Sequence, residues 1–270
     1  MIRVVIAELR KLRRPSLLLG TIATVGGLSA LFTSIIFLMI DSENGNSERG
    51  ERISAAELSN SMGLIYGFRL VGVFLGIVAL CIFASQTAQE YSLGTLRNLL
   101  VRQPSRMKIL AGKFIAMKLF ALVMVLFAGA LSIAISFALS GRAKVDTSSW
   151  STSAAMQLLF ENTLNIFIST LCFGAFGMIL GLLLRSPISA IAVGVLWNLI
   201  LENILGALIK STAKWLPGIN FQNLGAGGSL DLSYKHSLAI SAGYLIIGGG
   251  LAAILFKRCC QLATQRLNFH

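Results

Sequence analysis

Six stretches of the chain are long and apolar enough to cross a lipid bilayer, which constrains the fold more than any other feature. A transmembrane helix needs about 20 mostly apolar residues. Hydrophobic residues make up 55% of the 270 residues and charged residues 13%, against about 25% charged in a soluble domain. We therefore predict an all-α polytopic membrane protein with a single transmembrane domain over residues 1–270 and spans at about 17–40, 64–88, 114–139, 160–184, 187–208 and 237–256.

The distribution of positive charge predicts the orientation of these spans. The formal net charge is +12, and about twice as many Lys and Arg residues flank the spans on the side of the termini as on the opposite side. Because cytoplasmic segments carry this excess, we expect a multi-pass protein of the plasma membrane (the bacterial inner or cell membrane) with both termini cytoplasmic. Basic residues are not interleaved with aromatic ones, as in a single-stranded nucleic-acid site. The lipid bilayer is thus an expected partner and nucleic acid is not.

Two segments outside the spans have patterns of their own. Residues 1–16 are amphipathic up to Pro15, which predicts an interfacial helix in the inner headgroup layer. The alternative is a simple basic anchor before the first span. Residues 203–236 contain Trp215 and the helix-breaking pair Pro217-Gly218. Because broken backbone at membrane depth must be shielded by protein, we predict an outer re-entrant segment before the last span.

Small residues four apart occur in two of the spans. Gly72 and Gly76 lie in the second span, and Gly177 and Gly181 lie in the fourth. Such pairs let two helices approach closely. They predict either packing within one bundle or a seam between two copies of the chain.

The sequence carries no recognisable catalytic or metal-binding pattern. The four cysteines form no CxxC pair, and the two histidines have no metal-ligand residues close to them in the sequence. The phosphate-binding pattern G-x-x-x-x-G-K-[ST] is absent, as are Ser/His/Asp and paired-carboxylate constellations. We therefore expect that the chain is not an enzyme and binds no metal or cofactor itself.

The segment at residues 89–113 is too polar to cross a bilayer and connects the second and third spans. Leu93, Leu96, Leu99 and Leu100 recur at helical spacing, and Pro104 ends the pattern. Ser105 can cap a second helix that leads into the third span. On the predicted topology this segment is a short cytoplasmic helix linked to two spans, which can carry rigid-body motion from a cytoplasmic partner into the bundle.

This segment resembles the membrane subunits of ABC-2-type ABC transporters. The family has a characteristic order of residues in this segment: an acid, Gly-Thr, a basic residue, a Leu pair, Pro, Ser-Arg and a distal Lys. This chain matches that order with Glu90, Gly94, Thr95, Arg97, Leu99, Leu100, Pro104, Ser105, Arg106 and Lys113. The opening "AELRKLRRPS", with Glu8 and Lys11, and "LPG" at 216–218 are also similar to the family. Many members have an acid where this chain has Ala88.

The resemblance implies a permease subunit of an ATP-driven exporter. Two membrane subunits, identical or homologous, would form the substrate path and pair with two separate cytoplasmic ATPase subunits, which would bind the ATP and magnesium. A coupling helix at about 91–103 would transmit the closure of the ATPases. Carried over position by position, the residues expected to contact the ATPase are Glu90, Gly94, Thr95, Leu96, Arg97, Leu99 and Arg106.

Two other functional classes compete with this interpretation. An ATP-independent secondary transporter or channel would show charged groups at the membrane midplane or inverted repeats, whereas the ionisable groups here gather toward the outer ends of the spans. A non-transporting sensor or assembly protein would usually have a folded domain outside the membrane, and the sequence shows none.

Polar residues in three of the spans predict a second site near the outer surface. Polar groups facing lipid are costly, so these should face protein or a wet cavity. Two interpretations stay open: they line the substrate path, or Glu202 or Glu161 pairs with Arg69 or a loop lysine and holds an outer gate shut. The residues of this substrate path or outer gate are Arg69, Glu161, Asn165, Asn198 and Glu202, with Ser169 on the same helical face as Glu161 and Asn165.

Overall fold

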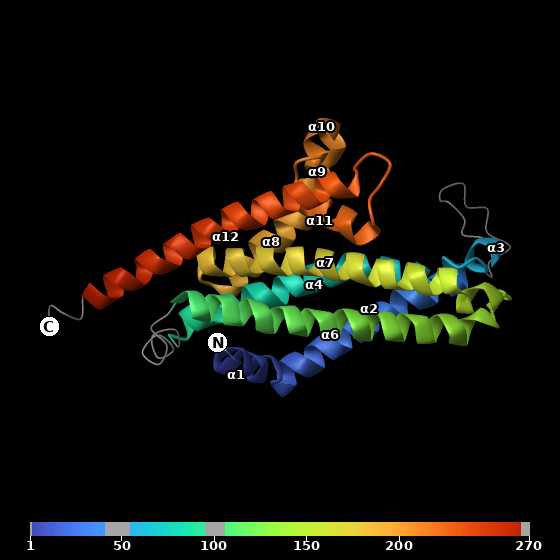
Figure 1. Ribbon diagram of the computed structural model, residues 1–270, viewed down its shortest axis with the longest axis horizontal. Helices are drawn as coiled ribbons and strands as arrows, with labels where there is room; N and C mark the ends of the chain where they lie inside the picture. The colour runs from blue at the N-terminus through green and yellow to red at the C-terminus, as the bar shows by residue number, and fades with distance from the viewer. Residues whose placement is uncertain (1, 41–54, 95–105, 266–270) are drawn as a thin grey trace.

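The computed structural model describes residues 2–40, 55–94 and 106–265, and nearly all of these are helical. The spans are formed by six long helical segments (Figure 1). Three short elements lie between them, namely α3, the 3₁₀ turn η1 and α10. The bounds are α1 Ile2–Leu12, α2 Pro15–Ile40, α3 Ala55–Leu58, α4 Gly63–Ser92, α6 Arg106–Ser140, η1 Ser148–Ser151, α7 Ser153–Leu184, α8 Pro187–Leu196, η2 Trp197–Leu201, α9 Glu202–Leu208, α10 Lys210–Ala213, α11 Pro217–Ala226 and α12 Tyr234–Gln265.

The prediction of an all-α polytopic protein with six spans is confirmed. Six helical stretches of the described chain have the length and composition needed to cross a membrane. Several helices continue beyond the apolar runs, because polar residues at their ends still extend the same helix. α6 begins at Arg106 and α7 at Ser153, although the expected spans began at 114 and 160. The fifth span comprises α8, the π-helical turn η2 and α9, over Pro187–Leu208 as expected.

α4 and α7 form the centre of the bundle, and the small-residue pairs account for their close contact. Gly177 lies directly against the backbone of Leu80, and a Cβ added at Gly181 would come within 2.7 Å of the carbonyl oxygen of Ala84. The other pair, Gly72 and Gly76, receives Ile166 and Phe173 of α7. The glycine pairs are therefore used for packing inside one chain, the first of the two interpretations.

The two ends of the bundle differ in what they carry. α1, the end of α4 and the start of α6 lie at one end, toward which α12 also runs, while α3 and η1 lie at the other (Figure 1). At the second end Trp150 is fully buried, and its indole N–H donates to the carbonyl of Leu58 at 2.9 Å. Which of the two ends is cytoplasmic stays a prediction from the charge distribution.

α11 folds back against the bundle before the last span. Pro217 supplies the fixed φ of a first helical position, and Gly227 ends the helix with a φ of +82°. Between them Phe221 is fully buried and stacks edge-to-face on Phe173 of α7, with ring centroids 5.2 Å apart. α11 thus lies beside the middle of α7, a position that suits the predicted re-entrant segment.

Candidate functional site

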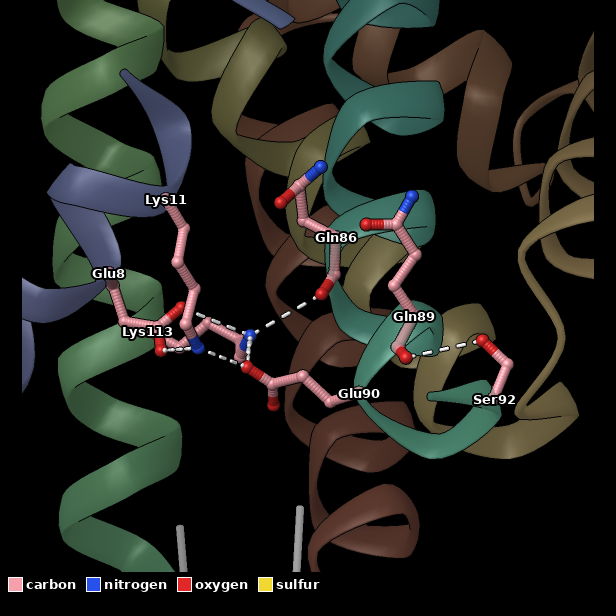
Figure 2. A network of polar contacts seen from close by, with 7 residues as sticks. All are labelled: Glu8, Lys11, Gln86, Gln89, Glu90, Ser92 and Lys113. Carbon is pink, nitrogen blue, oxygen red and sulfur yellow. Dashed lines mark hydrogen bonds and ion pairs between the residues drawn. The ribbon is translucent and has the colours of Figure 1, made fainter. Parts of the chain in front are cut away.

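Four charged side chains form a closed ion-pair network at the end of the bundle that carries α1 (Figure 2). Lys113 Nζ on α6 lies 3.2 Å from Glu8 Oε2 on α1 and 2.8 Å from Glu90 Oε1 on α4. Lys11 Nζ on α1 lies 2.6 Å from Glu8 Oε1 and 2.7 Å from Glu90 Oε1. Lys113 also donates to the carbonyl of Gln86 at 3.5 Å. The network joins three helices that are far apart in the sequence.

The inner members of this network are withdrawn from water. The side chains of Lys113 and Glu8 are 4% and 5% exposed, whereas that of Lys11 is 31% exposed. Two positive and two negative charges cancel, as a poorly hydrated site requires. Partial burial opposes the charged form of Lys11, but the carboxylates of Glu90 and Glu8 outweigh it and raise the pKa of Lys11 above 10.5. Lys11 therefore stays protonated at neutral pH.

The sequence of α1 explains why a carboxylate reaches this place. Val4, Glu8 and Leu12 are spaced by one helical turn and are buried, forming one face of the helix. Val4 packs on Gly112 of α6, where an added Cβ would come within 2.7 Å of Val4 Cγ1. Gly112 directly precedes Lys113, so this close approach brings Glu8 within reach of the ammonium group.

The predicted amphipathic helix is thus present, but among the apolar residues at helical spacing (Ile2, Val5, Ile6, Leu9 and Leu12) only Leu12 is buried. Ile2 and Ile6 are exposed, while Val5 and Leu9 are partly buried. The face against α6 is the one that carries Glu8. The exposed apolar side is free to enter a headgroup layer, which stays a prediction.

Glu90 and Gly94 are the residues of the predicted ATPase contact that the structure describes in full. The Glu90 side chain points into the network (Figure 2) and is 11% exposed. Gly94 directly follows the C-cap of α4 with a φ of +65°, and its N–H donates to the Tyr91 carbonyl at 3.2 Å. A Cβ at Gly94 would meet nothing within 4 Å. Within this chain, glycine is needed here for its left-handed backbone conformation at the helix end.

The other predicted ATPase contacts lie at or beyond the edge of the described chain. Arg106 is the first residue of α6. Thr95, Leu96, Arg97 and Leu99 lie outside the described residues. The helix expected at about 91–103 and its contact with an ATPase therefore stay predictions.

Glu202 is a helix-capping residue for α11. Its Oε1 accepts from the Gly218 N–H at 3.0 Å and from the indole N–H of Trp197 at 2.6 Å, and its Oε2 accepts from the Ile219 N–H at 2.8 Å. The two amides belong to the first turn of α11, where N–H groups have no partner within the helix. Leu216, which precedes α11, has no side-chain acceptor for them. A carboxylate from another helix therefore satisfies both amides and complements the helix dipole.

The expected ion pairing of Glu202 or Glu161 with Arg69 does not hold among the residues described, and neither carboxylate forms an ion pair with a loop lysine whose side chain is described. Arg69 donates instead to the carbonyl of Ala226 at 3.2 Å, and Glu161 accepts from Gln157 on its own helix at 2.8 Å. The physical reason is α11 itself. The first amides of α11 donate to Glu202, and the carbonyl of its last residue, Ala226, accepts from Arg69.

α11 brings together most of the polar residues predicted for the outer site. Ser169 donates to the Phe221 carbonyl at 2.7 Å, and Asn165 lies against Gly227. Asn198 is buried in the π-helical turn η2 and accepts from Gln222 of α11 at 3.5 Å. Glu161 is exposed and takes no part in this assembly.

Two parts of these sites cannot be recognised from the sequence pattern. Glu8, Lys11 and Lys113 had been noted separately, but nothing in their spacing showed that they meet around Glu90. One signal was available, since Glu8 is the only acid among the basic residues of the N-terminal helix. The capping role of Glu202 is also absent from the sequence interpretation, because Pro217-Gly218 indicates a break in the predicted re-entrant segment but not which residue accepts from the amides that follow it.

Comparison with known families gives one assignment. The model of the family described as "Protein of unknown function (DUF2705)" matches residues 30–259, which is most of the chain. The chain belongs to the DUF2705 family. Among curated proteins, none matches the chain. The DUF2705 match includes Glu90, Lys113 and Glu202 but excludes α1, so the network joins the matched region to a helix outside it.

Proposed function

We propose that this DUF2705 chain is the permease subunit of an ATP-driven exporter of the ABC-2 type. Two such subunits would line the substrate path in the plasma membrane, which is the inner or cell membrane of a bacterium. Both termini would be cytoplasmic. Two separate ATPase subunits would dock on the cytoplasmic side and bind the ATP and magnesium. The chain itself would perform no hydrolysis. The motif order at residues 90–113 supplies the family resemblance behind this proposal.

The observation that carries the proposal is the ion-pair network beside that motif. Glu90 lies just before the end of α4, and Lys113 lies in the second turn of α6, so their 2.8 Å contact clamps together the two helices that flank residues 95–105. Glu8 adds α1 to the same clamp. A push on residues 95–105 would then move three helices together, as a coupling element requires.

This arrangement assigns different roles to the motif residues. Glu90 would act by positioning α4 against α1 and α6, since its carboxylate is engaged within the chain. Gly94 would end α4 and turn the chain into the coupling stretch. Direct contact with the ATPase would fall to Thr95, Leu96, Arg97, Leu99 and Arg106.

The alternative of an ATP-independent transporter or channel receives less support. Its best candidate for an ion-coupling group is Glu202, a carboxylate buried within a span. Both of its oxygens are occupied by the amides of α11, and one also by Trp197. A group held this way suits structural capping more than a cycle of proton or cation binding.

The test is to purify the chain together with the ATPase encoded beside its gene and to measure complex formation and ATPase activity. Arg97→Glu should abolish co-purification, whereas the matched Arg142→Glu at the opposite end should not. Failure of any neighbouring ATPase to bind the unaltered chain, or survival of the complex with Arg97→Glu, would refute the proposal.

A fourfold charge reversal distinguishes the role of Glu90 from direct contact. The variant Glu8→Lys, Lys11→Glu, Glu90→Lys and Lys113→Glu preserves all four ion pairs while inverting each charge, and it gives up only the 3.5 Å hydrogen bond from residue 113 to the Gln86 carbonyl. If Glu90 acts inside the chain, this variant should retain the ATPase while Glu90→Lys alone loses it. Loss of the ATPase from both variants would show instead that the ATPase contacts Glu90 directly and depends on its charge.

A further inference from the structure

A cavity of about 290 Å³ lies where the outer half of α4 faces α7 and α11. α4 contributes one helical face, with Tyr66, Arg69, Leu70 and Val73 spaced by three or four residues. α7 contributes Ser169, and α11 closes the remaining side with Gln222, Gly225 and Ala226. The volume lies just below the range of pockets for drug-sized ligands, which suits a small polar group.

Arg69 is the permanently charged residue of this lining. One of its terminal nitrogens donates to the Ala226 carbonyl at 3.2 Å, and a guanidinium has five N–H donors, so most remain for a ligand. Within the described ranges, no carboxylate lies within ion-pairing distance of Arg69. The planar fork of such a group matches a phosphate or carboxylate in a bidentate manner.

The depth of Arg69 matches the outer headgroup layer. At about 1.5 Å per residue, the α4 segment from Arg69 to Glu90 is about 31 Å long, close to the thickness of a hydrocarbon core. If the Glu90 network lies at one boundary of the bilayer, Arg69 lies at the other. Leu70 and Val73, which follow toward the bilayer centre, are 39% and 42% exposed. A charged pocket thus opens beside an apolar surface of the same helix.

The wall opposite Arg69 is held in place by contacts at three points of α11. Glu202 caps its first turn, Ser169 binds the Phe221 carbonyl in its middle, and Arg69 binds its last residue. The cavity is therefore bounded by fixed elements, as a binding site requires, and not by a mobile loop.

We infer that this cavity binds the anionic headgroup of an amphiphile from the outer leaflet, with Arg69 on the phosphate or carboxylate and the hydrocarbon tail along Leu70 and Val73. Binding at the site requires no ATPase, whereas its assignment to the outer leaflet rests on the orientation in the proposed function. Its use as an exporter's substrate site would also rest on that proposal. The same chemistry is offered by a resident membrane lipid and by an exported amphiphile.

Calorimetric titration of the purified chain in an uncharged detergent tests the site. Dihexanoyl phosphatidylglycerol should bind at least about tenfold more tightly than dihexanoylglycerol, which has the same tails and lacks the phosphate, because one charge-assisted contact is worth about that factor. Arg69→Gln should remove this preference, and Arg69→Lys, which keeps the charge but loses the bidentate fork, should keep only part of it. Arg142→Gln, the same change at an exposed residue outside the cavity, should leave the preference unaltered.

A second variant separates ligand binding from stability. Val73→Trp leaves the Arg69–Ala226 bond in place and fills the apolar approach, so it should weaken binding of the anionic lipid without lowering the unfolding temperature of the ligand-free chain. Equal binding of the two lipids, equal effects of Arg69→Gln and Arg142→Gln, or binding of inorganic phosphate as tight as that of dihexanoyl phosphatidylglycerol would each overturn the inference.

A third experiment distinguishes an exported amphiphile from a resident membrane lipid. The complex of the chain with the ATPase is reconstituted in phosphatidylcholine alone, and its ATPase activity is measured. Stimulation of ATPase activity by added phosphatidylglycerol, lost in Arg69→Gln, supports the site and assigns it to cargo. Binding without stimulation supports the site and assigns it to a resident lipid. If no ATPase binds the chain at all, the proposed function fails while the calorimetric result still stands.

Discussion

Replacing Lys113 by Met should release α1 from the bundle. The substitution removes the most buried cation of the network while keeping a side chain of similar length. Glu8 and Glu90, which are 5% and 11% exposed, would then share Lys11 alone. The network would change from zero net charge to one uncompensated negative charge. Removing one partner of a buried ion pair costs about 3–5 kcal/mol.

The chain can avoid most of that cost by local undocking. If α1 leaves α6, Glu8 and Lys11 return to water together, Glu90 gains the water that α1 excluded, and the other lost contacts are chiefly those of Val4 and Leu12. The penalty therefore appears as a shift in the docking equilibrium of α1 and not as global unfolding. At 1.4 kcal/mol for each factor of ten, about 3 kcal/mol corresponds to a shift of roughly 100-fold.

Hydrogen–deuterium exchange of the purified chain measures this shift. Amides of residues 2–12 should exchange about 100-fold faster in Lys113→Met, while those of α7 stay unchanged. Lys108→Met is the matched control, because Lys108 is exposed on the same helix. Lys11→Met should have a smaller effect, about 1 kcal/mol, since Lys11 is 31% exposed. Equal exchange in Lys113→Met and Lys108→Met, or a larger effect of Lys11→Met, would refute this account of the network.

Three further predictions follow from single residues. Glu202→Gln puts an amide donor near the first N–H groups of α11 and should cost about 2 kcal/mol, seen as a lower unfolding temperature; loss of transport at unchanged stability would contradict a capping role. Gly94→Asn should keep ATPase co-purification better than Gly94→Ala, because asparagine tolerates a positive φ; equal loss would point to close approach of a partner. Since the folded-state pKa of Lys11 is raised above 10.5, its contribution to docking should be fully present below pH 10.5 and lost as pH rises through the folded value; a fluorophore pair on α1 and α6 that separates already near pH 8 would exclude this.

The spans were predictable because a bilayer imposes length and composition on each of them independently. α2 and the fifth span follow their apolar runs closely. The first residues of α6 and α7 were harder to predict. Whether a helix continues past an apolar run depends on polar residues whose partners are far away in the sequence. Lys113 is an example, because it lies just outside an expected span and is buried only when α1 and α4 are placed beside it.

The two polar sites show where a single sequence stops being informative. Glu90 and Glu202 could be selected from the sequence as site residues. Their partners could not, because they depend on how the helices are placed in the fold. Glu90 is 79 residues from Lys11, and Glu202 binds backbone amides that have no sequence signature of their own. Arg69 was expected to face protein or a wet cavity, and the partner it has in the structure is a backbone carbonyl brought close by α11.

The ion-pair network also bears on how the chain reaches its final topology during synthesis. α1 is made first, yet its buried carboxylate has to wait in water until α4 and α6 have been inserted and have delivered Glu90 and Lys113 to the same face of the membrane. A helical pair inserted upside down would present those two residues across the bilayer, out of reach of Glu8. Docking of α1 would thus be a late event that only the correctly inserted chain can complete. An undocked α1, with Val4 and Leu12 no longer buried, would then distinguish misinserted chains for the cell's quality-control proteases.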